Sequence, residues 1–349
     1  MYNAAAKAAA FVAFAAALGA AAPAASQTTE RVSLDTTVEA DVFRGQNALD
    51  RPNLIVDITG VVRIGGGWTA YVRPWFSQRR TTTVDKEIYQ AALQYERPGT
   101  VATRINLGYI VSPVGLGLMD TRPGVNPLIL PHLSYFTPMP PFEPGGAVMP
   151  AIASTYPLGG EVTLSGSKWD ARAALVNSSP TRIYVLNNTS PNPETAPVLE
   201  GGAGVTPKVG LRIGASFAHG RYATDRMLTL EGIEGEYAFG YTQLSGEVTH
   251  DTLQTASGHV DAYEWFVQGV QTLTPRWFIA ARQDGTSAPP PLSGASEDRR
   301  FFHTSEATLG YRVSPEVSLR SSFFARKTYT RTDWDQQVGV SLVWAHRWR

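Results

Sequence analysis

The sequence contains no cysteine among its 349 residues. This absence excludes disulfide bonds and thiolate metal sites, and it is compatible with passage through an oxidising compartment. An excess of charge of either sign is also missing, because 30 basic and 30 acidic residues give a formal net charge of +0. Such a balance does not suggest nucleic acid as a partner.

Long hydrophobic runs are absent except at the N-terminus, where MYNAAAKAAAFVAFAAALGAAAPAAS combines one basic residue, an apolar core and a series of small residues. The core holds about 15 residues, whereas a spanning helix needs ~20. Residues 1–26 are therefore predicted to be a cleaved secretory signal peptide, with cleavage after Ser26, or alternatively after Ala22. A transmembrane anchor is the other interpretation. The mature chain, residues 27–349, has lost Lys7 and carries a net charge of about −1.

After this leader, segments of about 10 to 14 residues alternate apolar and polar side chains up to the end of the chain, and Gly, Pro, Asn and Asp separate them. In the first such segment, Val32, Leu34 and Val42 belong to one face, and Glu39 and Asp41 belong to the other. A period of two predicts a β-strand. Because the second face is charged, it must meet water.

The same pattern recurs often enough to predict an all-β fold with about sixteen strands, and no segment reads as a convincing amphipathic helix. The predicted strands lie near residues 31–43, 53–64, 68–78, 86–96, 101–111, 158–167, 169–177, 196–205, 208–218, 227–239, 241–251, 260–272, 276–283, 301–313, 316–330 and 333–348. The segment 196–205 has poor strand chemistry, so fourteen strands is the alternative count.

The last predicted strand, residues 333–348, gives the most specific evidence for the type of fold. One row of alternating residues carries Trp334, Trp344 and Trp348 near its ends, where indoles favour the headgroup region of a bilayer. Within it, residues 337–344 (QVGVSLVW) resemble the C-terminal assembly signal of bacterial outer-membrane barrels, although five residues follow Trp344, whereas the family usually ends on its aromatic residue. The resemblance implies a transmembrane antiparallel up-and-down β-barrel in the bacterial outer membrane, surrounded by its lipid.

The links between the predicted strands differ in length. Barrel turns on the periplasmic side are short. We therefore place five tight links there, namely Gly65-Gly-Gly, Arg97-Pro-Gly, Thr206-Pro-Lys, Thr274-Pro-Arg and Ser314-Pro-Glu. The longer polar links, residues 178–195, 252–259 and 284–300, are predicted to be extracellular.

One link, residues 112–156, is too long and too rich in proline for an ordinary connection, since nine prolines lie between Ser112 and Thr155. It is also too apolar to extend into solvent. It is expected either to fold into the barrel mouth as a constriction or to pack on a neighbouring subunit. Its place after the fifth strand resembles the inward-folded third loop of general porins.

Alternation points charged residues of both signs into the predicted lumen. We expect the pore lining and constriction to be formed by Arg104, Asn106, Asp120, Arg122, Glu143, Arg172, Arg212 and Arg320. The arginines near the long link would face its acidic residues across a narrow eyelet. The alternative is that these charges pair across neighbouring strands and stiffen a closed wall. The sixteen predicted strands and the inward-facing arginines also resemble the phosphate-selective porins. Here, however, the acidic residues are as numerous as the basic ones, so phosphate specificity is not inferred.

These observations predict a porin that allows passive diffusion of small hydrophilic solutes or ions. A plugged barrel with a structural or binding role is the alternative. A barrel hydrolase is less favoured: His250 with Asp251 and His303 with Glu306 are the only pairs considered, and no nucleophile or metalloprotease motif supports them. No enzyme activity, cofactor or metal site is expected. A homotrimer is compatible with the apolar link or with a flat lipid-facing wall.

Overall fold

The computed structural model describes residues 31–45, 52–78, 84–116, 122–133, 139–143, 156–180, 196–290, 300–327 and 333–348. The predicted signal peptide, residues 1–26, and the predicted constriction residue Asp120 lie outside these ranges. No helix among the described residues is long and apolar enough to cross a membrane.

The chain forms one closed antiparallel barrel of sixteen strands, in which each strand pairs with its neighbours in sequence. The strands are β1 (Val32–Gly45), β2 (Asn53–Gly65), β3 (Trp68–Gln78), β4 (Asp85–Arg97), β5 (Ala102–Tyr109), β6 (Leu158–Ser165), β7 (Trp169–Val176), β8 (Val198–Lys208), β9 (Leu211–Ala223), β10 (Arg226–Phe239), β11 (Thr242–Thr255), β12 (Gly258–Thr272), β13 (Trp277–Ser287), β14 (Phe301–Arg312), β15 (Val317–Lys327) and β16 (Asp335–Trp348). The predicted fold class and the count of sixteen are confirmed, and the doubtful segment 196–205 is part of β8.

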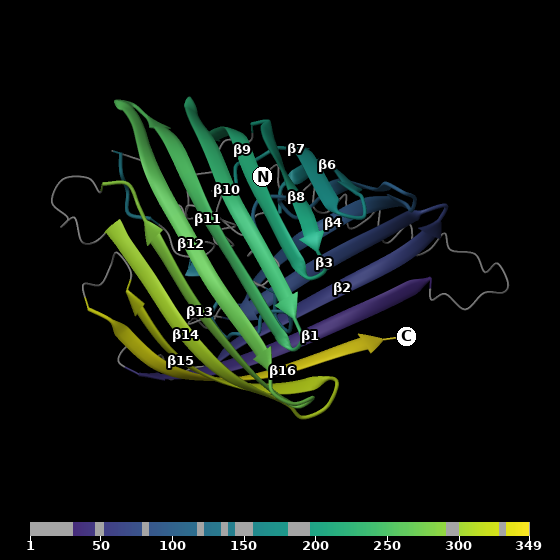
Figure 1. Ribbon diagram of the computed structural model, residues 1–349, viewed down its shortest axis with the longest axis vertical. Coiled ribbons are helices and arrows are strands. Elements are labelled where there is room, and N and C mark those ends of the chain that lie inside the picture. The colour runs from purple at the N-terminus through teal and green to yellow at the C-terminus, as the bar shows by residue number, and fades with distance from the viewer. Residues whose placement is uncertain are drawn as a thin grey trace.

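The ring closes where β16 lies beside β1, as Figure 1 shows. In the register of this pair, Asp41 lies opposite Ser341 and Val42 lies opposite Val340. Asp41 and Ser341 are buried, whereas Val42 and Val340 are exposed on the outer face. The polar row of each strand therefore faces the space inside the ring, here called the lumen, and the apolar row faces outward, as the alternation predicted.

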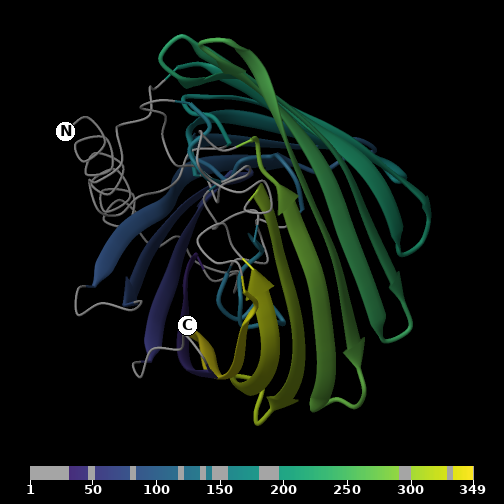
Figure 2. The ribbon, with the colours of Figure 1, turned by 90° about the vertical axis from the view of Figure 1, so that its left-hand side faces the viewer.

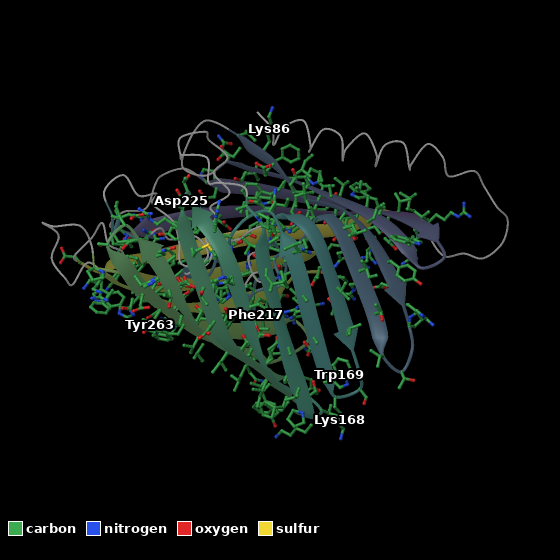
Figure 3. All side chains as sticks on the ribbon, turned by 90° about the horizontal axis from the view of Figure 1, so that it is seen from above. Lys86, Lys168, Trp169, Phe217, Asp225 and Tyr263 are labelled. Carbon is green, nitrogen blue, oxygen red and sulfur yellow. The ribbon has the colours of Figure 1, made fainter. Side chains whose placement is uncertain are left out.

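The two rims of the barrel differ. At the rim called here the turn end, every described link is tight, for example residues 66–67 between β2 and β3 and residues 240–241 between β10 and β11. The other rim, the loop end, carries the longer connections. Figure 3 labels Lys168 and Trp169 at the turn end and Asp225 at the loop end, with Phe217 on the outer wall between them.

Two predicted links are wrong in detail. Thr206-Pro-Lys continues β8, and the turn follows at Val209 and Gly210, where glycine accommodates a φ of +84°. Residues 252–259 are not a long loop, because β11 and β12 continue to a two-residue turn at Ala256 and Ser257. The polar side chains at the ends of β11 and β12 continue the alternation of the strands, so they belong to the sheet and not to a loop.

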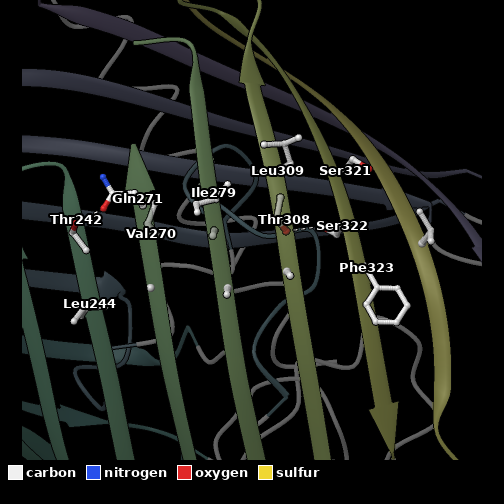
Figure 4. Close-up of a pocket in the computed structure, with 15 residues that line it drawn as sticks. Thr242, Leu244, Val270, Gln271, Ile279, Thr308, Leu309, Ser321, Ser322 and Phe323 are labelled. Atoms are coloured by element: carbon white, nitrogen blue, oxygen red, sulfur yellow. Dashed lines mark hydrogen bonds between the residues drawn. The ribbon is translucent and has the colours of Figure 1, made fainter. Parts of the chain in front are cut away.

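The outer wall has a hollow of about 690 Å³ over β11 to β16 (Figure 4). It follows a row of small residues, Gly269, Ala281 and Ala307, which lie opposite one another on three successive strands. Leu244 and Phe323 border the row. Since these side chains point away from the lumen, the hollow belongs to the apolar outer surface and not to the interior site described next.

Candidate functional site

The connection between β5 and β6, residues 110–157, enters the lumen, and Figure 2 shows its described parts inside the ring of strands. Near its start, the Ser112 hydroxyl donates to Glu200 of β8 at 2.8 Å. The Leu116 amide donates to Glu247 of β11 at 2.6 Å. In the ring of sixteen strands β8 lies three strands and β11 lies six strands from β5, so the connection leaves its own part of the wall and runs across the interior.

Its middle section is held against β13 to β15. Glu306 accepts the amide hydrogens of Ile129 (2.8 Å) and Leu130 (3.1 Å). Arg282 donates to the carbonyl oxygens of Leu130 (2.9 Å) and Pro131 (2.8 Å). Asp284 accepts the Leu133 amide hydrogen at 3.0 Å. The wall charges thus satisfy the backbone of a proline-rich segment that has no ladder partners of its own.

Arg320, predicted to line the pore, completes this attachment. Its Nη1 donates to the carbonyl oxygens of Asn126 and Leu128, both at 2.7 Å. Its Nη2 lies 2.7 Å from Ser341 Oγ and 2.7 Å from Glu39 Oε1. The side chain is only 3% exposed. Arg320 therefore fixes the connection to the strands that close the barrel, and it is not a free charge in the lumen.

A second buried cluster, on β2 to β4, was not predicted from the sequence. Arg73 pairs with Asp57 through two short contacts, Nε to Oδ1 at 2.8 Å and Nη2 to Oδ2 at 2.6 Å. Its Nη1 donates to the Tyr156 hydroxyl at 3.0 Å. The Tyr156 ring in turn stacks on Tyr89 at 4.6 Å. This cluster holds the returning end of the connection to the wall.

Arg122 lies beside this cluster. It donates to Gln90 Oε1 on β4 at 2.7 Å, and the positive charge of Arg73 is near enough to act on it. Burial, and then the Arg73 charge, lowers the pKa of the Arg122 guanidinium. Arg122 was predicted to line the pore, and its hydrogen bond at this position is to the amide of Gln90.

Two further predicted pore residues, Arg172 and Arg212, lie flat against the wall of β7 to β10. Arg212 bridges two carboxylates, with Nη2 at 2.8 Å from Asp170 and Nη1 at 2.6 Å from Glu234. Arg172 reaches Glu234 at 3.1 Å. Both arginines are 18% exposed. The alternative that lining charges pair across strands therefore describes this group.

Glycines in β8 explain how these arginines fit, and they explain the poor strand chemistry of this segment. A Cβ on Gly202 would lie 3.1 Å from Arg172 Nε, and a Cβ on Gly204 would lie 2.7 Å from Arg212 Nη2. Such separations are shorter than van der Waals contact, so any side chain at these positions would displace the guanidinium groups. Because Gly202 and Gly204 have no side chains, they leave the space that the two guanidinium groups occupy.

The other predicted residues are not brought together into one eyelet. Arg104 is half exposed near the turn end of β5 and pairs with Glu96 at 2.8 Å. Asn106 donates to Glu161 on β6 at 2.8 Å. Glu143 lies at the loop end, where it contacts Arg226 at 3.3 Å and accepts the Ala256 amide hydrogen. Arg104 and Glu143 thus lie at opposite rims, and a single field between them is ruled out by this geometry.

The histidine pairs considered for hydrolysis are separated by strand alternation. His250 is exposed and contacts Asp261 at 3.0 Å, whereas Asp251 is fully buried on the other face. His303 and Glu306 likewise occupy positions of opposite parity on β14. Among the described residues, no group of three or more His, Asp or Glu side chains is placed to hold a metal ion.

A closed antiparallel ring with an apolar outer face has no water-exposed edge and no second layer to cover its outward valines and leucines, so its outer face requires a bilayer. With a polar lumen crossed by its longest connection, the chain has the architecture of a porin-like β-barrel of the bacterial outer membrane. No protein-family model matches the chain, and no curated protein sequence matches it.

Solved structures are similar in fold. The complex of Salmonella typhi OmpF with daunomycin superposes with a TM-score of 0.62 at 10% identity, over 90% of this chain and 97% of that chain. The anion-selective porin from Comamonas acidovorans gives 0.60 at 10% identity, over 90% and 99%. The trimer form of OmpT, an outer membrane protein of Vibrio cholerae, gives 0.58 at 11% identity, over 90% and 99%.

Proposed function

We propose that this protein is a porin through which small hydrophilic solutes or ions diffuse passively, and that the connection between β5 and β6 narrows its lumen. The observation that carries the proposal is the attachment of this connection inside the ring by Arg320, Arg282, Glu306 and Asp284. A constriction that must leave a constant aperture needs a fixed loop, and a hydrogen-bonded, ionic attachment provides one. The similar porins support this proposal at the level of the fold.

Conductance measurements on planar bilayers test the proposed porin function. Purified protein is expected to insert in discrete steps of ion conductance, and each step should be uniform in size because the connection is fixed to the wall. A chain lacking residues 120–150 should conduct more per step. If the intact chain gives no steps while the shortened chain does, the barrel is plugged, and the structural or binding alternative replaces the porin.

A hydrolase remains the least supported function. We infer that the chain is not an enzyme, because strand alternation separates the acidic residue from the histidine in both pairs considered. Release of a fluorescent product from peptide or phospholipid substrates by the purified barrel, abolished by His250→Ala or His303→Ala, would contradict this inference.

We also propose that the barrel associates as a homotrimer in lipid. The support is the trimer form of one similar barrel and the flat small-residue row on β12 to β14, which lets another apolar surface approach closely. Chemical crosslinking in native membranes should give a ladder that ends at three subunits. A single monomer band under conditions that crosslink a known trimer would contradict the proposal.

A further inference from the structure

A cavity of about 240 Å³ lies between residues 129–133 of the β5–β6 connection and the wall formed by β1, β2 and β14 to β16. Water occupies roughly 30 Å³ in the liquid, so this space equals about eight water molecules. Phe43 and Phe324 form part of its lining, and their ring centroids lie 5.7 Å apart, edge to face. The cavity therefore has the size and the apolar surface to hold a small organic molecule.

One carboxylate oxygen in this cavity has no donor among the residues that the structure describes. Asp41 lines the cavity and is 3% exposed. That oxygen is its Oδ1. A buried carboxylate oxygen without a donor is costly, and a ligand that donates to it would remove that cost.

The charges around Asp41 favour a cation. Glu39 adjoins Asp41 on the same strand face, and Arg320 is the positive group paired with Glu39, at 2.7 Å. When both carboxylates are ionised, the one guanidinium leaves one negative charge uncompensated. The lining also includes Arg326, which lies 3.8 Å from Asp335, so this pair adds no net charge. An ammonium group on Asp41 would balance the remaining charge.

The cavity is also preformed. Its side made by the connection cannot close onto the wall, because the Ile129 and Leu130 amides are bound to Glu306 and the Leu130 carbonyl oxygen is bound to Arg282. A binding site that does not have to be ordered when the ligand arrives loses less free energy on binding.

We propose that this cavity is a binding site for a small organic ammonium ion with an apolar, preferably aromatic, body. The ammonium donates to Asp41 Oδ1, and the body packs between Ile129 and the rings of Phe43 and Phe324, which also attract a cation through their faces. Only the consequence of binding rests on the proposed porin function: such solutes would be held in the lumen while they pass through the pore. Binding itself requires no open pore.

The test measures binding to the folded barrel in detergent by isothermal titration calorimetry. Three probes of similar shape differ in charge: 2-phenylethylamine, 2-phenylethanol and 3-phenylpropionate. At about pH 8.5, 2-phenylethylamine is protonated and 3-phenylpropionate is ionised, so the two probes carry opposite charges. The amine is expected to bind at least about tenfold more tightly than either of the others, as a charge-assisted hydrogen bond predicts.

Asp41→Asn should remove this preference, so that the amine binds about as weakly as the alcohol. Asp35→Asn is the matched control, because it is the same substitution on the same strand, at an exposed carboxylate that pairs with Arg347 outside the cavity; the preference should persist. Equal binding of amine and alcohol to the wild-type protein, or a preference that survives Asp41→Asn, would overturn the proposal. These results do not depend on conductance, so a failure here is distinct from a failure of the porin proposal.

Discussion

Arg320 is the residue at which the β5–β6 connection, the first strand and the last strand meet. Arg320→Ala would leave the Glu39 carboxylate buried without its cation, and such a loss costs about 3–5 kcal/mol. We expect this decrease in the free energy of unfolding, measured by urea titration of tryptophan fluorescence, together with larger and noisier conductance steps.

Arg104→Ala is the matched control for that substitution. The Arg104–Glu96 pair is half exposed on both sides, and an exposed pair contributes at most about 1 kcal/mol. If both variants lost a similar free energy of unfolding, burial would not be the reason for the contribution of Arg320 to stability.

Gly204 of β8 lies against the Arg212 guanidinium. Gly204→Ala should lower the free energy of unfolding by about 1–3 kcal/mol, because the new methyl group would overlap the Arg212 guanidinium, which two carboxylates hold in place. At Gly235, the nearest atom to a new Cβ is the Arg212 carbonyl oxygen at 3.7 Å, so Gly235→Ala should be tolerated. Denaturant titration of both variants distinguishes this packing effect from a general intolerance of alanine in the barrel.

At the scale of elements, β16 continues to Trp348, as the strand predicted near residues 333–348 does, although the assembly-signal pattern ends at Trp344. Trp344 lies between Val38 of β1 and Val317 of β15. Trp348 lies opposite Leu34 of β1, past the start of β15, where its Nε1 donates to Thr36 at 3.0 Å. Trp344 therefore contributes to two strand interfaces, and Trp348 extends beyond one of them.

We accordingly predict that Trp344→Ala lowers the yield of folded barrel more than Trp348→Ala does. The fraction of protein that shows heat-modifiable migration on gels in isolated outer membranes measures this yield. If Trp344→Ala assembled normally and Trp348→Ala did not, the aromatic residue that matters for assembly would be the last one, and the proposed register of the signal would be wrong.

The strands were predictable from the sequence because alternation is a local property: each residue of β1 or β16 meets either lipid or the lumen according to its parity. The path of the connection was not predictable, since its contacts join distant positions, such as Ile129 with Glu306, 177 residues apart. Tyr89, whose ring lies beside the Arg73 guanidinium, was missed for another reason. The β3–β4 pairing shifts between Arg73 and Pro74 and skips Tyr89 of β4, so simple alternation does not describe the inward face of that strand.

For the whole molecule, charges of both signs line the lumen and several of them pair with one another, so strong ion selectivity is not expected. Asp170, Arg172, Arg212 and Glu234 sum to zero, as do Asp57 and Arg73. The full sequence has a formal net charge of +0. A pore selects by sign when unpaired charges of one sign surround its narrow section, and the described lining offers no such ring.

We therefore predict a permeability ratio for K⁺ over Cl⁻ within about threefold of one, read from the reversal potential in a tenfold KCl gradient of about 0.1 to 1 M. Arg104→Glu should shift this ratio toward K⁺, because Arg104 is the half-exposed cation near the turn end and its replacement faces Glu96. Arg320→Met, which removes a buried cation, should shift it less. A ratio beyond about tenfold in either direction for the wild-type pore would mean that unpaired charge surrounds the constriction, and the compensated lining described above would not govern permeation.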